Sequence, residues 1–459
     1  MDPSCSLRLV TAAADPLHEV DGEAVELLQT LIRNACVNDG SDASGHEGRS
    51  ADVLASVLTG PGVDLETYSA VPGRTNLVAR VEGSDPAAPT LALVGHTDVV
   101  PVTAAHWSRD PFGGELVDGE VWGRGAVDML NLTATMALAL RRLADRGWRP
   151  RGTLVLAAVA DEEASSTHGV HWLLDHATDA VAADFVITES GGIPLPGADG
   201  TKLPVIVGEK GCIWATLRVH GAAGHASQPL RTDNALVTAA EVVRRIDAYR
   251  PETMIHDTWR RFVAGMAFPP ELAGALVDPD RLAELVEVLP IGMARQAHAC
   301  THTTLAPTML HGTTKLNVIP GVVDLDVDVR TLPGHTAEDV RAMLVDAAGD
   351  LAAKVEVVRV EGEDASLSPA DTPLWGVLAS VARRWYPDAA LVPYFSVGAT
   401  DARWYRRLGA VGYGFGLFST ELSLDDFGAR FHGDDERIDV KSLGLSAAMF
   451  ETVAAEFLS

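Results

Sequence analysis

The sequence predicts an α/β fold in which helices cover both faces of a mostly parallel β-sheet, with a smaller α+β domain inserted into it. Three observations support this prediction. Short apolar strands alternate with helical segments over residues 23–189, strands after residue 210 alternate apolar with polar residues, and α/β character returns beyond residue 333. Strands alternating with helices indicate a parallel sheet with both faces covered, whereas apolar–polar alternation indicates one solvated face. The 459 residues also exceed what one ordinary core requires.

Residues 1–211 are expected to form the first part of the larger domain. Two helical segments come first, because apolar residues recur every three or four positions in "AVELLQTLIRNA" and "GRSADVLASVL", with the polar loop 38–48 between them. Continuous apolar runs then predict buried strands, which alternate with a strong helical segment. The expected strands span residues 75–81, 90–96, 152–160 and 183–189, and the expected helix spans residues 132–145.

Residues 212–332 are expected to form the inserted domain, and residues 333–459 the second part of the larger domain. In the insertion, strands at 213–221 and 322–333 flank a helix-leaning segment at 232–300. The second part contains an expected strand at 355–362, a helix at 374–385, a strand at 410–418 and a C-terminal helix at 442–458. A larger domain built from both chain ends is the simplest organisation that fits this order.

The composition is that of a globular protein, with 47% hydrophobic and 22% charged residues. A formal net charge of -27 would repel phosphates, so neither nucleic acid nor a membrane is expected as a partner. The chain has no run of about 18 apolar residues and begins without a basic and then apolar segment, so the expected location is cytoplasmic. The cysteines lack CxxC spacing and predict neither a disulfide framework nor a thiolate zinc site; they are Cys5, Cys36, Cys212 and Cys300.

The strand in "LALVGHTDVVP" ends in His96 and Asp98. Side chains two positions apart on an extended chain point to the same side, so an imidazole and a carboxylate are presented together. Open α/β sheets bind ligands at the carboxyl ends of their strands, which favours a functional role for this pair. A capping Asp beside a hydrogen-bonded His is the ordinary structural alternative.

Four further places in the larger domain carry acids or a histidine near strand ends or in loops. These are Asp128 before a helical run, Glu162 and Glu163 after one strand, Glu189 after the next, and His432 in "RFHGDDE". Taken singly, each has a structural alternative, such as a helix N-cap, an exposed loop charge or a surface histidine. Taken together they suit a two-metal site, which needs a shared carboxylate and then one histidine and one more acid for each ion.

Six motifs in this order and spacing resemble one known family; they are "GHTDVVP", "GRGAVDM", "ADEE", "GHASQP", "LNVIP" and "HGDDE". The family is that of the dinuclear-zinc aminoacylases and carboxypeptidases, with acetylornithine deacetylase and succinyl-diaminopimelate desuccinylase among its members. The resemblance covers residues 25–455 and implies a zinc-peptidase-like sheet domain with an inserted lid and dimerisation domain. In one departure, Leu130 and Asn131 stand where relatives often have a lysine and glycines, which concerns the subfamily rather than the ligands.

The resemblance also implies a role for each candidate residue of the larger domain. His96 and Glu189 would hold one metal ion, Glu163 and His432 would hold the other, and Asp128 would bridge the two. Glu162 would be the general base, and Asp98 would steady the His96 imidazole. The expected cofactors are two divalent ions, with zinc preferred and cobalt or manganese compatible with the same ligands.

Residues outside these strand ends match the family as well. His225 in "GAAGHASQP" would enter the partner subunit's active site to stabilise the oxyanion, so a homodimer is expected. Asn317 and Arg330 would contact the substrate, Arg330 by clamping a carboxylate with its planar guanidinium. Gly398, Thr400 and Asp401 in "SVGATDARW" resemble the substrate-binding turn. From the residues alone, an exposed strand arginine and a plain glycine-rich turn remain alternatives.

The expected function is metal-dependent hydrolysis of an amide or peptide bond beside a free carboxylate, in an N-acyl amino acid or a short peptide. Bound metal would lower the pKa of a bridging water, and Glu162 would take its proton and pass it to the leaving amine. Glu at position 189 is typical of the family's deacylases and carboxypeptidases, whereas its aminopeptidases tend to have Asp there. The alternatives are a dipeptidase or aminopeptidase that recognises a free amine, and a non-catalytic binding protein on the same fold.

Overall fold

The computed structural model describes residues 16–312 and 315–459, which divide into two compact units. Unit 1 contains the described residues up to Leu195 together with Pro373–Pro387 and Phe415–Ser459, and unit 2 contains Pro196–Thr372 and Asp388–Gly414. The insertion expected at 212–332 lies within unit 2, which also takes in chain on either side of it. Cys5 lies outside the described residues, and the other three cysteines are free thiols.

Unit 1 is built on a mixed sheet of apolar strands. The strand order is β1 (Asp64–Ser69), β2 (Thr75–Val81), β6 (Thr153–Val159), β3 (Thr90–His96) and β7 (Phe185–Thr188). β3 runs parallel to both β6 and β7, whereas β2 is antiparallel to β1 and β6. β6 is buried along its whole length, which explains its uninterrupted apolar run "TLVLAAV". The predicted α/β class is confirmed, with antiparallel pairing at the β1 edge.

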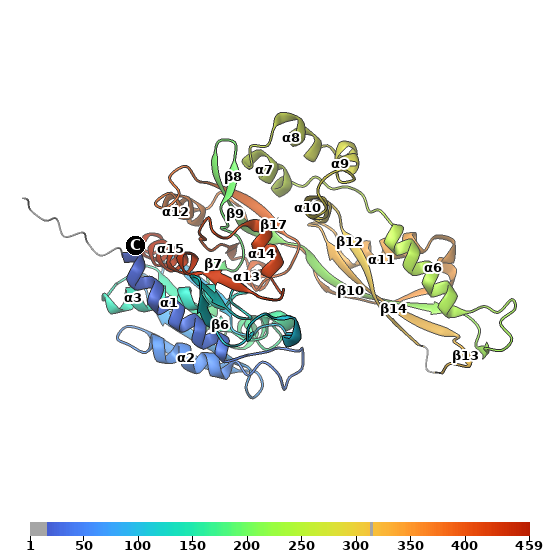
Figure 1. Ribbon diagram of the computed structural model, residues 1–459, viewed down its shortest axis with the longest axis horizontal. Helices are drawn as coiled ribbons and strands as arrows, with labels where there is room; N and C mark the ends of the chain where they lie inside the picture. Colours follow the sequence, from blue (N-terminus) through green and yellow to red (C-terminus); the bar gives the residue numbers. More distant parts are fainter. Residues whose placement is uncertain (1–15, 313–314) are drawn as a thin grey trace, which may run out of the picture. The chain divides into compact units, whose positions relative to one another are not determined.

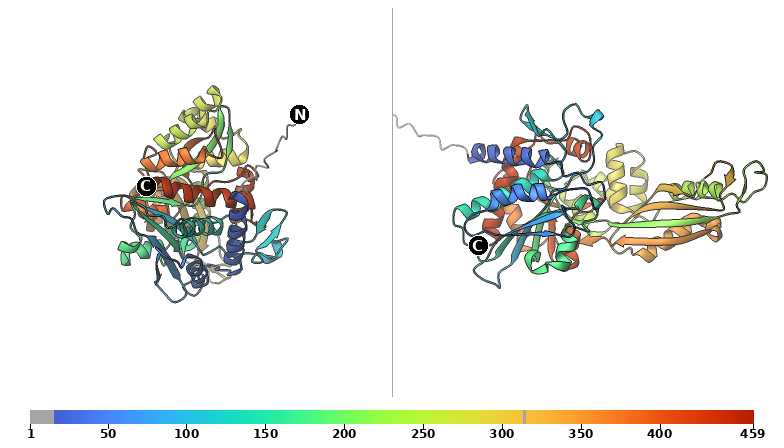
Figure 2. Two further views of the ribbon diagram at one scale, coloured as in Figure 1. Left: turned by 90° about the vertical axis from the view of Figure 1, so that its left-hand side faces the viewer. Right: turned by 90° about the horizontal axis from the view of Figure 1, so that it is seen from below.

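Helices from both ends of the chain pack together in unit 1. α1 (Pro16–Arg33), α3 (Leu130–Asp145) and α15 (Val440–Phe457) contact one another and lie side by side in Figures 1 and 2. α3 is rich in Ala and Leu, which are strong helix formers, and most of its residues are buried. Unit 1 also contains α2 (Gly48–Leu58), α4 (Val170–His176), α5 (Thr178–Val181), α12 (Pro373–Ala382) and α14 (Leu424–Arg430).

A small antiparallel sheet joins the C-terminal part of unit 1 to its N-terminal part. Its strand order is β19 (Arg437–Asp439), β5 (Glu120–Trp122) and β4 (Glu115–Val117). β19 begins shortly after His432, and β5 ends shortly before Asp128. The pairing of these two strands therefore anchors two loops that carry candidate site residues from opposite ends of the sequence.

Unit 2 contains a four-stranded antiparallel sheet with helices on one face. The strand order is β12 (Thr304–His311), β14 (Val322–Thr331), β10 (Gly211–His220) and β15 (Val355–Glu363). Every second residue of β10 and β14 is buried, as their apolar–polar alternation predicts. The buried residues form a core with α6 (Ala235–Ala248) and α11 (Ala337–Ala348), which lie along the same face in Figure 1.

The remainder of unit 2 combines a second group of strands with a cluster of short helices. The strands are β8 (Leu195–Gly197), β9 (Gly200–Glu209), β16 (Ser366–Leu367), β17 (Ala390–Ser396) and β18 (Val411–Gly414). The helices are α7 (Asp257–Gly265), α8 (Pro270–Leu276), α9 (Pro279–Leu285), α10 (Ile291–Thr301) and α13 (Ala402–Arg407). β17 runs parallel to β9 and packs against α7. Among the described residues, none of the helices is both long and apolar enough to cross a membrane.

Candidate metal centre

The carboxyl ends of three neighbouring strands in unit 1 bring candidate residues together. His96 is the last residue of β3, Glu189 directly follows β7, and Glu162 and Glu163 lie in the short helix η2 (Glu162–Ala164) that follows β6. Because β3 is parallel to β6 and β7, these ends meet at one edge of the sheet. Asp128 reaches the same edge from the loop before α3.

Asp128 lies between two histidines from distant parts of the chain. Its Oδ1 is 3.1 Å from Nε2 of His96, and its Oδ2 is 2.9 Å from Nε2 of His432. On the His432 side, the same Nε2 is 3.2 Å from Oε2 of Glu163. On the His96 side, Oε2 of Glu189 is 3.9 Å from Nε2. Glu189 thus lies beside His96, Glu163 lies beside His432, and both histidines contact the carboxylate of Asp128.

The electrostatics of this cluster are those of crowded, desolvated carboxylates. Burial, together with the charges of Asp128 and Glu162, raises the pKa of Glu189 well above its ordinary value. Burial and the charge of Asp128 also raise the pKa of Glu163. Hydrogen bonds to Asp128 and Glu163 raise the pKa of His432 to about 10. The cluster therefore attracts cations, because the negative charge of several neighbouring carboxylates stabilises a positive charge placed among them.

The donor set fits divalent metal ions. The described residues include two groups of three possible ligands, and within each group the ligand atoms lie within 4.8 Å of one another. One group is His96, Asp128 and Glu163, and the other is His96, Glu162 and Glu189. Oε1 of Glu163 is buried and has no hydrogen-bond partner among the described residues, as expected of an oxygen that coordinates a metal ion. Imidazole nitrogen and carboxylate oxygen are ligands for zinc, cobalt and manganese.

Asp98 contacts the imidazole of His96 mainly through its backbone. Nδ1 of His96 is 2.9 Å from the carbonyl oxygen of Asp98 and 3.6 Å from its carboxylate. The carboxylate instead accepts the backbone N–H groups of Glu162 and Glu163, each at 3.2 Å, and the side-chain amide of Asn38 at 2.8 Å. Asp98 thus orients the histidine and also fixes the turn that carries both glutamates.

A buried ion network behind this turn was not expected from the sequence. Arg74 is only 1% exposed and contacts the carboxylates of Glu47 at 2.9 Å and Asp161 at 2.7 Å. Asp161 directly precedes Glu162, and Asn38 donates to it at 3.1 Å. The sequence offered only a weak signal, because Glu47 and Asn38 lie in a segment whose polar composition predicts a solvated loop.

The lid candidates lie together in unit 2. His225 is exposed, and its Nδ1 is 2.7 Å from the hydroxyl of Ser227. The strand β11 (Gly224–His225) pairs with β13 (Val318–Ile319), and the carbonyl of Asn317 accepts a hydrogen bond from Ala226. This antiparallel pairing therefore brings His225 and Asn317 near each other from distant parts of the chain.

Arg330 lies on the face of the unit 2 sheet opposite the helices. Its Nε and Nη2 donate to the two carboxylate oxygens of Asp328 at 2.8 Å and 3.1 Å. Trp214, on the neighbouring strand, donates to the same carboxylate at 3.1 Å. The guanidinium fork is thus already oriented by a carboxylate on its own strand.

The predicted substrate turn follows β17 in unit 2. Gly398 is exposed, whereas Thr400 and Asp401 are buried. The N–H of Thr400 donates to Glu209 at 2.5 Å, and Glu209 in turn pairs with the buried Arg406 at 2.8 Å. This turn is therefore held by a buried ion pair rather than by its glycine alone.

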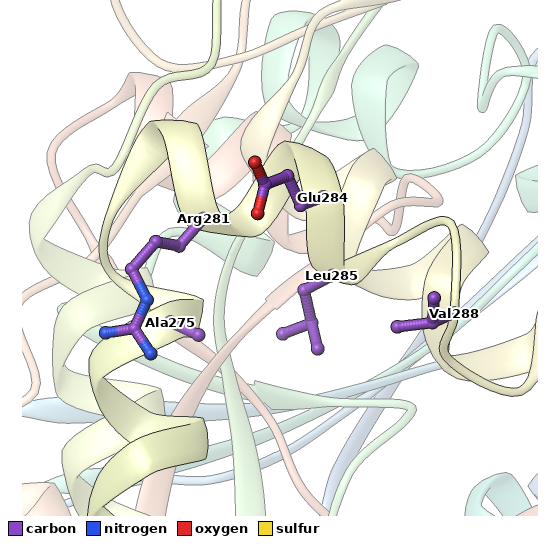
Figure 3. Close-up of a pocket in the computed structure, with 5 residues that line it drawn as sticks. All are labelled: Ala275, Arg281, Glu284, Leu285 and Val288. Carbon is purple, nitrogen blue, oxygen red and sulfur yellow. The ribbon is translucent and has the colours of Figure 1, made fainter.

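A separate surface pocket of unit 2 lies between α8 and α9. It is lined by Ala275, Arg281, Glu284, Leu285 and Val288 (Figure 3). None of these residues is among the predicted site residues, and the lining carries a single acid and a single base. The chemistry therefore points to the cluster in unit 1 rather than to this pocket.

Comparison with known proteins agrees with this geometry. A profile of peptidase family M20/M25/M40 matches residues 92–456. The N-fatty-acyl-amino acid synthase/hydrolase PM20D1 of Homo sapiens is 28% identical over 374 residues, covering 79% of this chain and 73% of that protein. A succinyl-diaminopimelate desuccinylase of Cereibacter sphaeroides is 27% identical over 423 residues, covering 90% of this chain and 94% of that protein. The solved structure of the M20 family metallo-carboxypeptidase Sso-CP2 from Sulfolobus solfataricus matches with a TM-score of 0.68 and 15% identity, covering 97% of this chain and 99% of that one.

Proposed function

The chain belongs to peptidase family M20/M25/M40, and from this premise we propose that it hydrolyses an amide bond next to a free carboxylate, as a deacylase of N-acyl amino acids or a carboxypeptidase. It is a metal-dependent amide hydrolase, like the relatives named for such reactions. The proposal rests above all on one observation, the carboxylate of Asp128 lying between His96 and His432. A carboxylate shared by two imidazoles, each with its own acid, is the ligand arrangement that a two-metal site requires.

We propose that His96, Asp128, Glu163, Glu189 and His432 hold two divalent ions, most simply zinc. Bound ions in such a site polarise the substrate carbonyl and lower the pKa of bound water. Glu162 accepts the proton of the attacking water and returns it to the leaving amine, because a carboxylate oxygen within 4.8 Å of ligand atoms of His96 and Glu189 is close enough to reach water at this centre. Asp98 keeps Glu162 and Glu163 in place through their N–H groups.

The proposed substrate is a small molecule or short peptide with a carboxylate beside the scissile bond. Nε and Nη2 of Arg330 donate to Asp328, and the remaining N–H groups of Nη1 and Nη2 offer a second planar fork for the substrate carboxylate. Asn317 and the turn carrying Gly398, Thr400 and Asp401 are proposed to contact the rest of the substrate. Glu189 supports a deacylase or carboxypeptidase, because the family's aminopeptidases tend to have Asp at this position. The runner-up is a dipeptidase that recognises a free amine.

We further propose a homodimer in the cytoplasm, with unit 2 providing the lid. His225 is exposed at the end of β11, which is where a residue that completes a partner's site would need to be. The three described cysteines are free thiols, which supports a reducing compartment.

The proposed function is tested by removing metal and restoring it. The purified protein, treated with chelator and then reloaded with zinc, cobalt or manganese, is assayed on N-acyl amino acids, dipeptides and N-succinyl-diaminopimelate. We expect hydrolysis only in the reloaded samples, and only of compounds with a free carboxylate beside the bond. Cleavage that survives complete metal removal would contradict the metal site. Cleavage of carboxamides, with a strict need for a free amine, would favour the dipeptidase.

A further inference from the structure

The motif "HGDDE" ends in an acid, Glu436, for which the proposed reaction has no role. Glu436 is fully buried, although it lies only four residues beyond His432 on the same loop. A carboxylate without access to solvent has to be satisfied by protein donors, and the identity of those donors indicates its role.

Both oxygens of Glu436 accept hydrogen bonds from the loop that carries Asp128. Oε1 accepts the backbone N–H of Val127 at 2.6 Å and the N–H of Asp128 itself at 3.0 Å. Oε2 accepts the N–H of Gly125 at 3.0 Å. Three backbone donors on one carboxylate fix the conformation of the short segment 125–128, and with it the direction in which Asp128 leaves the backbone.

Arg124 links the same carboxylate to the histidine. Its Nη1 donates to Oε2 of Glu436 at 2.8 Å, and its Nη2 donates to the carbonyl of His432 at 3.3 Å. The guanidinium is only 4% exposed and lies 5.2 Å above the ring of Trp107. Arg124 therefore joins the Asp128 loop and the His432 loop through side chains, in addition to the β5–β19 pairing.

We propose that Glu436 and Arg124 are positioning residues that set the bridging carboxylate of Asp128 and the imidazole of His432 at the spacing that two metal ions require. The inference rests on the proposed metal site and adds a pair of residues that touch neither substrate nor metal. Glu436 holds the segment that carries Asp128, which both ions share, whereas Arg124 contacts both Glu436 and the carbonyl of His432. Loss of the Glu436 carboxylate should therefore weaken both ions alike, whereas loss of Arg124 should weaken most the ion on the His432 side.

The first experiment measures metal affinity directly. Metal-free wild type and Glu436→Gln are titrated with zinc against a chromophoric chelator, and the cobalt-loaded forms are examined by absorption and by magnetic coupling between the two ions. An amide can present only one acceptor oxygen to four donors, so both ions should bind about 10–100-fold more weakly, the loss typical of outer partners of metal ligands. The magnetic coupling between the two cobalt ions should decrease together with the two affinities.

Arg124→Met and Arg124→Lys test the role of Arg124 separately from that of Glu436. They remain informative if Glu436→Gln does not fold. Arg124→Met should weaken the ion on the His432 side about 10–100-fold and the other ion less, because the buried Glu436 also loses its counter-charge. Arg124→Lys, which can reach only one of the two acceptors, should fall between wild type and Arg124→Met. For loaded samples, kcat should fall while KM changes little.

Asp434→Asn is the matched control. It removes one negative charge from the same loop, but Asp434 is exposed and its contact is with the His106 imidazole, at 3.6 Å. Metal affinity should stay at the wild-type value in this control. Folded Glu436→Gln and Arg124→Met that bind both ions with wild-type affinity would overturn the proposal, even if they melt at a lower temperature. A wild-type protein that binds no ions would instead overturn the proposed function.

Discussion

At the scale of single residues, two adjacent glutamates have different surroundings. Oε2 of Glu163 is 3.2 Å from His432 and its other oxygen is buried without a partner, which suits a metal ligand. Glu162 lies on the side of His96 and Glu189. We therefore expect Glu162→Gln to retain near-normal metal content while kcat falls by about 10²–10⁴, because the amide cannot accept a proton.

Elemental analysis and steady-state kinetics of Glu162→Gln and Glu163→Gln check this assignment together. Glu163→Gln should lose one ion. If Glu162→Gln loses metal and Glu163→Gln does not, the roles of the two residues are reversed.

The proposed carboxylate clamp is a second test at the residue scale. Lysine cannot reproduce the planar fork of Arg330, so Arg330→Lys should raise KM for a free acid by about 10–100-fold, the value of a charge-assisted hydrogen bond, and change KM for its carboxamide little. Arg218→Lys is a matched control, because Arg218 forms the same forked contact with Asp324, at 2.9 Å for both atoms, on the same sheet. Equal losses on acid and carboxamide would place Arg330 in the scaffold instead.

The sequence indicated which residues would gather at the candidate metal centre, because each one occupies a strand end or a motif, and strand ends of a parallel sheet meet in space. It did not predict which atoms make the contacts. The carboxylate of Asp98 accepts N–H groups of Glu162 and Glu163, and such contacts depend on the conformation of a loop 64 residues further along the chain. The burial of Arg74 was invisible for the same reason, since its two partners come from different loops.

At the scale of elements, long periodic segments were predicted closely and short ones were not. The helix expected at 442–458 is α15 (Val440–Phe457), and the strand expected at 90–96 is β3. The three-residue strands β4, β5 and β19 were not predicted, because a strand that short has no readable period and owes its pairing to register between distant segments. The strand expected at 410–418 is shorter in the structure, where β18 spans Val411–Gly414.

A buried ion pair joins strand β9 to helix α13, and its removal gives a test at this scale. Glu209 pairs with Arg406 and also accepts from Thr400 and Ser366. Glu209→Gln leaves Arg406 buried without its counter-charge, so we expect it to destabilise the protein by about 3–5 kcal/mol. It should also raise KM, because the turn containing Thr400 loses its anchor.

Urea unfolding and steady-state kinetics measure the two effects of Glu209→Gln. Glu241→Gln, which removes an exposed partner of Arg244 and Arg245, should cost far less stability than Glu209→Gln, because solvent screens the exposed pair. A loss of stability as small as that of the exposed control would show that the buried pair does not hold these elements together.

At the scale of the whole molecule, the change of strand pattern near residue 210 predicted that a separate unit interrupts the larger domain. The compact unit observed is larger than the insertion at 212–332, because β9 and β17 pair with each other and both belong to unit 2. A change in hydrophobic period marks where the exposure of a strand changes. Such a change carries no information about which other strands pair with that strand. The range 212–332 therefore stays a proposal for the lid and dimerisation domain.

The proposed dimer makes the whole assembly part of the reaction. If His225 completes the partner subunit's site, then Glu162→Ala and His225→Ala should each be nearly inactive alone. A mixed dimer would contain one site with an intact Glu162 and an intact His225 from the partner. Random pairing makes about half of the dimers mixed, each with one good site of two, so co-refolding the two variants should restore roughly a quarter of wild-type activity.

Three outcomes of this mixing experiment lead to different conclusions. If both residues act within one chain, no mixed dimer has a complete site and no activity returns. If His225 only satisfies its own contact with Ser227, the 2.7 Å hydrogen bond seen in unit 2, then His225→Ala alone stays active. Recovery that requires both variants in the same vessel, and that disappears when one of them carries both substitutions, therefore establishes that the site is assembled from two chains. The exposure of His225 is then explained by the partner, because the imidazole is left uncovered for the site that it completes.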